Sequence, residues 1–118
     1  MEVTLEELRR RLGEEGFVVL DVRSRAEFSG EAGYPCDPRQ GHIPGAVHLD
    51  VQELLELAPE QIAARLPAGT EVVAYCHSGS RSAFAAQILR AAGYDARNYA
   101  GSWHEWSRDE SLPSEASK

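Results

Sequence analysis

The sequence has no apolar run long enough to cross a bilayer, and its first sixteen residues are charged throughout and lack the apolar core of a signal peptide. We therefore expect a cytoplasmic protein with no membrane partner. Cysteine is scarce as well: Cys36 and Cys76 stand in unlike surroundings, which argues against a disulfide framework. Basic residues are too few for a nucleic-acid partner, because 12 Lys and Arg against 19 Asp and Glu give a net charge of -7.

The chain of 118 residues, 42% of them apolar, is long enough for one hydrophobic core and too short for two. We expect a single domain over 1–107 and a flexible polar tail over 108–118. Extended and helical patterns alternate along the domain, which predicts an α/β fold with a parallel sheet covered by helices on both faces. The extended patterns fall at 17–20, 46–49, 71–75 and 96–99.

A reactive thiol is predicted at Cys76, which ends the extended run 71–75 and precedes a tight turn and a helical pattern. Gly79 permits the turn, because glycine tolerates a positive φ, and the N–H groups of such a turn tend to converge. Amide donors at a helix N-terminus lower the pKa of a thiol from its usual ~8.5. The alternative is a small buried hydrophobe at the end of a strand.

Arg81 and His77 suggest an anion beside this thiol. A cation in the first turn of a helix, such as Arg81, is unfavourable unless an anion shares the site, and an anionic substrate is the natural candidate. The alternative for Arg81 is a guanidinium that points to solvent. His77 either donates to the same anion or points to solvent.

Four motifs, in this order, resemble those of the rhodanese-like sulfurtransferases. They are LDVR at 20–23 followed by Glu27-Phe28, GHIPGA at 41–46, the six-residue loop 76–81, and NYAGSW at 98–103 with Trp106. The resemblance covers nearly the whole chain and implies a five-stranded, mainly parallel sheet flanked by helices on both faces. It also implies that Cys76 and Arg81 are catalytic and that the substrate is bound by the loop residues His77, Ser78, Gly79 and Ser80, with Ser82 at the helix start.

The resemblance implies transfer of a sulfane sulfur from thiosulfate, or another persulfide or polysulfide donor, to a thiophilic acceptor such as cyanide or a thiol. Cys76 would carry the sulfur as a persulfide. The implied partners are a small anionic sulfur donor and the acceptor, with a sulfur-accepting protein as a further option; no cofactor and no metal are implied. Two other functions stay open, a noncatalytic or sulfur-relay module and a phosphatase or arsenate reductase. The latter enzymes have five residues between cysteine and arginine, whereas four separate Cys76 from Arg81.

The sequence departs from compact members of the family in a longer stretch at 29–40, which carries Cys36. We expect an exposed thiol there; the alternative is that Cys36 resolves the persulfide as a disulfide. The natural donor also stays open, because the loop differs from the CRKG-type loop linked to thiosulfate use.

Other residues are expected to be structural. Asp21 and Arg23 should hold the end of the first strand and pair with Glu27, and the two tryptophans should lie in the core. Capping boxes are predicted for helices that start after Ser24 and at Ser102.

Overall fold

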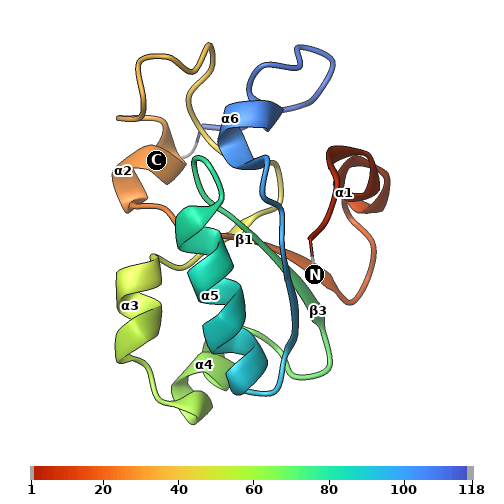
Figure 1. Ribbon diagram of the computed structural model, residues 1–118, viewed down its shortest axis with the longest axis vertical. Helices are drawn as coiled ribbons and strands as arrows, with labels where there is room; N and C mark the ends of the chain where they lie inside the picture. The colour runs from red at the N-terminus through yellow and green to blue at the C-terminus, as the bar shows by residue number, and fades with distance from the viewer. Residues whose placement is uncertain (1, 117–118) are drawn as a thin grey trace.

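The computed structural model describes residues 2–116 and shows a parallel sheet between two layers of helices (Figure 1). Its four strands run in the order β2-β1-β3-β4, and all neighbours are parallel. Among the described residues, no helix is both long and apolar enough to span a membrane. The elements are α1 (Leu5–Arg11), β1 (Phe17–Asp21), α2 (Arg25–Ser29), β2 (Val47–His48), α3 (Val51–Glu56), α4 (Pro59–Arg65), β3 (Glu71–Tyr75), α5 (Ser80–Ala91), β4 (Asp95–Asn98) and α6 (Ser102–Trp106).

Each face of the sheet has its own core, because successive side chains of a strand point to opposite sides. In β1, Leu20 faces the cluster formed with α3, α4 and α5, whereas Phe17 and Val19 face the cluster formed with α1 and α6. Figure 1 shows α3, α4 and α5 gathered on one side of the sheet and α1 on the other. The prediction of an α/β fold with helices on both faces is therefore confirmed.

The expected number of strands was wrong: the described residues form four strands rather than five. A fifth would lie at the outer edge of β4, where Glu2 makes a single parallel bridge to Asn98 and the Val3 N–H donates to the Asn98 carbonyl at 2.9 Å. Thr4 already caps α1 by accepting a hydrogen bond from the Glu7 N–H. Among the described residues, the chain thus turns into a helix directly after this one bridge.

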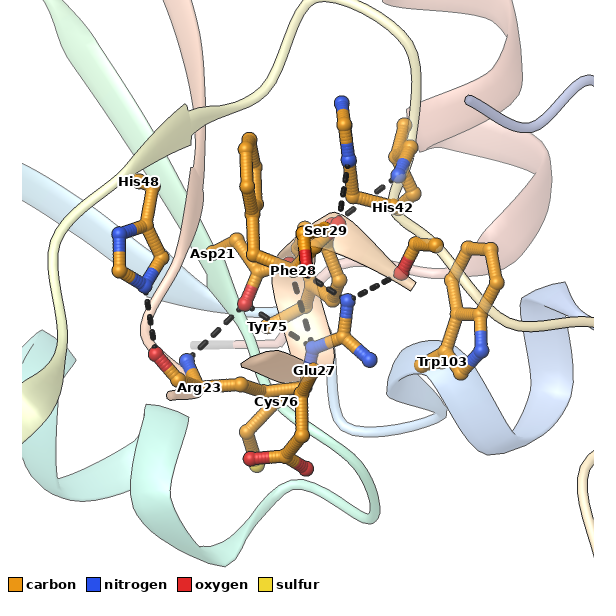
Figure 2. A network of polar contacts seen from close by, with 12 residues as sticks. Asp21, Arg23, Glu27, Phe28, Ser29, His42, His48, Tyr75, Cys76 and Trp103 are labelled. Carbon is orange, nitrogen blue, oxygen red and sulfur yellow. Dashed lines mark hydrogen bonds and ion pairs between the residues drawn. The ribbon is translucent and has the colours of Figure 1, made fainter. Parts of the chain in front are cut away.

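A buried ion pair closes the carboxyl end of β1 (Figure 2). Arg23 is 1% exposed, and its guanidinium pairs with Asp21 at 2.7 Å and donates to the Gly41 carbonyl at 2.6 Å. The expected pairing with Glu27 was wrong, because the Glu27 carboxylate faces another arginine. Trp103, which lies beside the Arg23 guanidinium, is fully buried, as is Trp106, so both tryptophans belong to the core as expected.

The long stretch between α2 and β2 packs against the C-terminal segment. The Arg39 guanidinium donates to the carbonyls of Trp106, Ser107, Asp109 and Leu112, and the His42 N–H donates to the Glu115 carbonyl at 2.7 Å. The described part of the segment, up to residue 116, therefore lies along the domain. The boundary at 107 and the flexibility of 108–118 stay predictions, and residues 117–118 lie outside the described part.

Candidate active site

Cys76 lies at the carboxyl end of β3, where the chain turns into α5. Its backbone is held on both sides by the segment around α6: its N–H donates to Ser102 Oγ at 3.0 Å, and its carbonyl accepts from the Trp103 N–H at 2.9 Å. The residue is 1% exposed. Ligands of parallel sheets bind at the carboxyl ends of the strands, so the thiol occupies the edge of the sheet at which a substrate is expected.

The sulfur of Cys76 accepts hydrogen bonds from the start of α5. The Gly79 N–H donates to Sγ at 3.1 Å and the Ser82 hydroxyl at 3.3 Å. Burial raises the pKa of the Cys76 thiol, but the Ser82 hydroxyl and the N–H groups of Ser82, Gly79 and Ser78 outweigh it and lower the pKa below its ordinary value. The convergence of donors expected from the sequence is thus present, and it favours the thiolate.

The turn that presents these donors is closely confined. Gly79 has a φ of +100°, and a Cβ added there would lie 2.6 Å from the carbonyl oxygen of Ala100. Its own carbonyl accepts from Asn98 Nδ2 at 3.2 Å. Only glycine combines this φ with such a close approach. The loop is therefore fixed by its neighbours, as well as by its own sequence.

Arg81 lies in the first turn of α5, but its anionic partner is a protein side chain. Nη1 lies 2.9 Å from Glu27 Oε1, and Nη2 lies 3.1 Å from Glu27 Oε2. Burial raises the pKa of Glu27, yet the bonds from Arg81 and Ser24 outweigh this and bring it down to about 2. The sequence analysis named an anionic substrate as the natural partner of Arg81 and missed Glu27, whose carboxylate also completes the predicted capping box with Ser24.

The other predicted loop residues contribute unequally. Ser78 and Ser80 have exposed side chains, and the Ser78 N–H is the smallest of the influences that lower the pKa of the Cys76 thiol. The His77 ring turns toward the stretch 30–41: it stacks on Tyr34 at 3.7 Å between ring centroids and lies 3.1 Å from Asp37 Oδ2. The structure thus brings Gly79 and Ser82 to the sulfur and directs the His77 ring to the insertion. Cys36 is exposed, as expected.

Ser102 is a site residue that the sequence patterns did not reveal. It is the only described residue other than glycine with a positive φ, 55°, and its hydroxyl accepts from the Cys76 N–H while donating to the Tyr99 carbonyl at 2.8 Å. The predicted capping box at this helix was therefore wrong, because the hydroxyl bonds back to the active-site strand. The sequence signal that could have pointed to this role is a serine directly after a glycine, shortly beyond the end of a strand.

A hollow of about 330 Å³ lies next to the Arg81–Glu27 pair. Glu27 forms part of its wall, together with Ser24, Gly33, Tyr34 and Pro35. The insertion therefore builds one side of a space that borders the active-site ion pair.

Comparison with known proteins agrees with this geometry. The model of the rhodanese-like domain matches residues 4–109. The chain belongs to the rhodanese-like domain family. A probable 3-mercaptopyruvate sulfurtransferase of Pseudomonas aeruginosa is 39% identical over 118 residues, which span 90% of this chain and 41% of that protein.

Two further rhodanese relatives differ in how much of their length this chain covers. The human thiosulfate:glutathione sulfurtransferase is 36% identical over 92% of this chain and 95% of its own length. A crystal structure of a probable thiosulfate sulfurtransferase, 43% identical, superposes with a TM-score of 0.79 over 97% of this chain and 47% of that one. The chain thus spans less than half the length of the bacterial relative and of this crystal structure, and nearly all of the human protein.

Proposed function

We propose that this rhodanese-like domain is a sulfurtransferase that moves a sulfane sulfur through Cys76. The observation that carries the proposal is the set of donors on the Cys76 sulfur, since Gly79 N–H and Ser82 Oγ–H stabilise a thiolate in a buried site. The human relative that this chain covers almost completely is a thiosulfate:glutathione sulfurtransferase, which supports the same chemistry for a chain of this length.

The reaction has two displacements. The Cys76 thiolate attacks the outer sulfur of thiosulfate, a new S–S bond forms, and the bond to the sulfonate sulfur breaks so that sulfite leaves with the electron pair. The persulfide then holds the negative charge. A thiolate or cyanide acceptor attacks the terminal sulfur, and Cys76 leaves as the thiolate with which the cycle began. Each step breaks one sulfur–sulfur bond and forms either a new sulfur–sulfur bond or, with cyanide, a carbon–sulfur bond, so no external oxidant is required.

Arg81 is the proposed contact for the anionic part of the donor. A guanidinium carries five N–H donors, and Glu27 engages two of them, so others remain for a sulfonate or a polysulfide. The carboxylate of Glu27 also weakens the attraction of the site for anions. Both the thiosulfate donor and the acceptor would approach by way of the hollow beside this ion pair.

A phosphatase or arsenate reductase is disfavoured by the loop. Four residues separate Cys76 from Arg81, and a Cβ added at Gly79 would lie only 2.6 Å from the Ala100 carbonyl oxygen. The size of the loop thus favours a sulfur atom over a phosphoryl group. A cytoplasmic location stays a prediction.

Steady-state sulfur transfer tests the proposal. Purified protein is assayed with thiosulfate as donor and either cyanide or glutathione as acceptor, alongside Cys76→Ser and Cys36→Ser. We expect Cys76→Ser to abolish transfer and Cys36→Ser to retain it, because the exposed thiol has no part in the two displacements. Transfer that survives in Cys76→Ser would refute the proposal. Loss of transfer in Cys36→Ser alone would instead show that the insertion thiol resolves the persulfide.

A further inference from the structure

Four side chains of the kinds that bind metal ions meet on the outer side of the active-site loop. Cys36 and Asp37 come from the insertion, His77 from the loop after β3, and His104 from α6. One ligand atom from each lies within 4.8 Å of all the others. His77 Nε2 is 3.1 Å from Asp37 Oδ2, His104 Nδ1 is 3.7 Å from Oδ1, and Cys36 Sγ is 3.9 Å from Oδ1.

The buried carboxylate at the centre of this cluster is incompletely satisfied. The Asp37 side chain is 1% exposed; Oδ1 accepts a hydrogen bond from Arg108 Nη1 at 2.9 Å, whereas Oδ2 has no hydrogen-bond partner among residues 2–116. His77 Nε2 forms a hydrogen bond with Oδ1 at 3.4 Å and lies 3.1 Å from Oδ2, with which it forms no hydrogen bond. Leaving a buried carboxylate oxygen unpaired is costly. The free oxygen points to a ligand among the four side chains.

The types of side chain in this cluster indicate which metal ion it would bind. We propose that the cluster binds a zinc ion through Cys36 Sγ, Asp37 Oδ2, His77 Nε2 and His104 Nδ1. Thiolate and imidazole suit Zn²⁺, whereas Mg²⁺ and Ca²⁺ prefer oxygen donors alone. Tetrahedral bonds to zinc place ligand atoms roughly 3.3–3.8 Å apart, so the cluster needs to contract by about 1 Å. The exposed Cys36 and the half-exposed His104 have the freedom to do so.

The surroundings of the cluster fit the outer shell of a metal site. Arg108 holds Oδ1 and thereby orients Oδ2, as hydrogen bonds to ligating carboxylates do, and Tyr34 stacks on the His77 ring. The Arg108 charge opposes a nearby cation, but a Cys36 thiolate and the Asp37 carboxylate supply two negative charges to a dication. Because Cys76 is not among the ligands, zinc would tie the insertion to the active-site loop without occupying the nucleophile.

Cobalt and zinc titrations of the reduced protein, free of any affinity tag, test this site. Co²⁺ should bind with one equivalent per chain and give a thiolate-to-cobalt charge-transfer band, and Zn²⁺ should displace it. Cys36→Ser should lose the band, and His104→Ala should bind Zn²⁺ about tenfold more weakly or worse, measured by competition with a chromophoric chelator. Cys76→Ser is the matched thiol control and should keep both the band and the affinity.

Thermal unfolding gives a second measurement that does not depend on the spectrum. Zinc should raise the Tm of the wild type and of Cys76→Ser, and it should raise the Tm of Cys36→Ser and His104→Ala by clearly less at the same zinc concentration. Absence of binding to the wild type would overturn the proposal. A cobalt band that disappears in Cys76→Ser but persists in Cys36→Ser would also overturn it, as would an unchanged zinc affinity in His104→Ala.

Discussion

Arg81 and Glu27 form a two-pronged ion pair across the mouth of the active site, with Nη1 to Oε1 at 2.9 Å and Nη2 to Oε2 at 3.1 Å. The pair joins the first turn of α5 to α2, two elements that follow neighbouring parallel strands. It fixes the guanidinium near Cys76 and at the same time offsets its charge. The affinity of the site for an anionic donor therefore depends on Glu27 as well as on Arg81.

Removing the charge of Glu27 should strengthen the binding of thiosulfate. In Glu27→Gln the amide can still cap α2, but the positive charge of Arg81 is no longer balanced. We expect the KM for thiosulfate to fall roughly threefold to tenfold with little change in kcat, and the gain to shrink at high salt. Initial rates of sulfur transfer at two ionic strengths measure both effects.

Glu53→Gln is the matched control, since Glu53 pairs with Arg65 at 3.0 Å on the surface formed by α3 and α4. Its KM should equal that of the wild type. A KM for thiosulfate that stays the same or rises in Glu27→Gln would mean that the Glu27 carboxylate does not weaken donor binding, and the proposed balance of charges at Arg81 would be wrong.

The same ion pair should make stability depend on pH in the acid range. The pKa of Glu27 is about 2 in the folded protein against an ordinary 4.5, so the pair stabilises the fold above pH 4.5, and this contribution is lost as the pH falls toward 2. It amounts to at most about 3 kcal/mol. Urea unfolding at several pH values should show a steeper acid loss in the wild type than in Glu27→Gln. Parallel curves for the two proteins would contradict the depressed pKa.

The hydroxyl of Ser82 should control the reactivity of the thiol. Ser82→Ala removes the Oγ–H donor that lies 3.3 Å from the Cys76 sulfur, so the pKa of the thiol should rise and its alkylation at neutral pH should slow roughly threefold to tenfold. Ser80→Ala, which alters an exposed side chain, should leave the alkylation rate unchanged. Rates of iodoacetamide alkylation as a function of pH decide this. If the alkylation rates of Ser82→Ala and the wild type depend on pH in the same way, the Ser82 hydroxyl does not determine the pKa of the Cys76 thiol.

The contacts within the loop around Cys76 could be predicted from the sequence, whereas the contacts of the loop with distant residues could not. Cys76, Gly79 and Ser82 are close together in the chain, so a strand-turn-helix pattern is enough to bring their donors and acceptor together. Glu27 is different, because its contact with Arg81, 54 residues further along the chain, depends on the pairing of β1 with β3. The sequence therefore predicted its capping role and assigned its charge to the wrong arginine.

The same limit applies to the edges of the fold. The helical and extended patterns predicted the alternation of elements, yet the implied fifth strand depends on whether residues before α1 stay at the sheet edge or enter the helix. Thr4 favours the helix over the strand, because its side chain caps the first turn of α1. The cluster of Cys36, Asp37, His77 and His104 likewise has no spacing that marks it, since its members meet only through the packing of the insertion.

Ser102 offers a test of how the active-site strand is held. Ser102→Ala should lower the free energy of unfolding by about 1–3 kcal/mol, because the Cys76 N–H and the Tyr99 carbonyl both lose their partner. Ser102→Gly should be about 1 kcal/mol less damaging, since glycine relieves the positive φ. Ser111→Ala, at an exposed position, is the control for urea unfolding. A Ser102→Gly variant that is less stable than Ser102→Ala would contradict the proposal that the positive φ of Ser102 strains the backbone.

Intact-mass measurement after exposure to thiosulfate tests the central claim most directly. The wild type should gain one sulfur atom, Cys36→Ser should gain the same, Cys76→Ser should gain none, and cyanide should remove the added sulfur while forming thiocyanate. A wild type that gains no sulfur from thiosulfate, polysulfide or glutathione persulfide, or a Cys76→Ser variant that still gains it, would contradict sulfur transfer through Cys76.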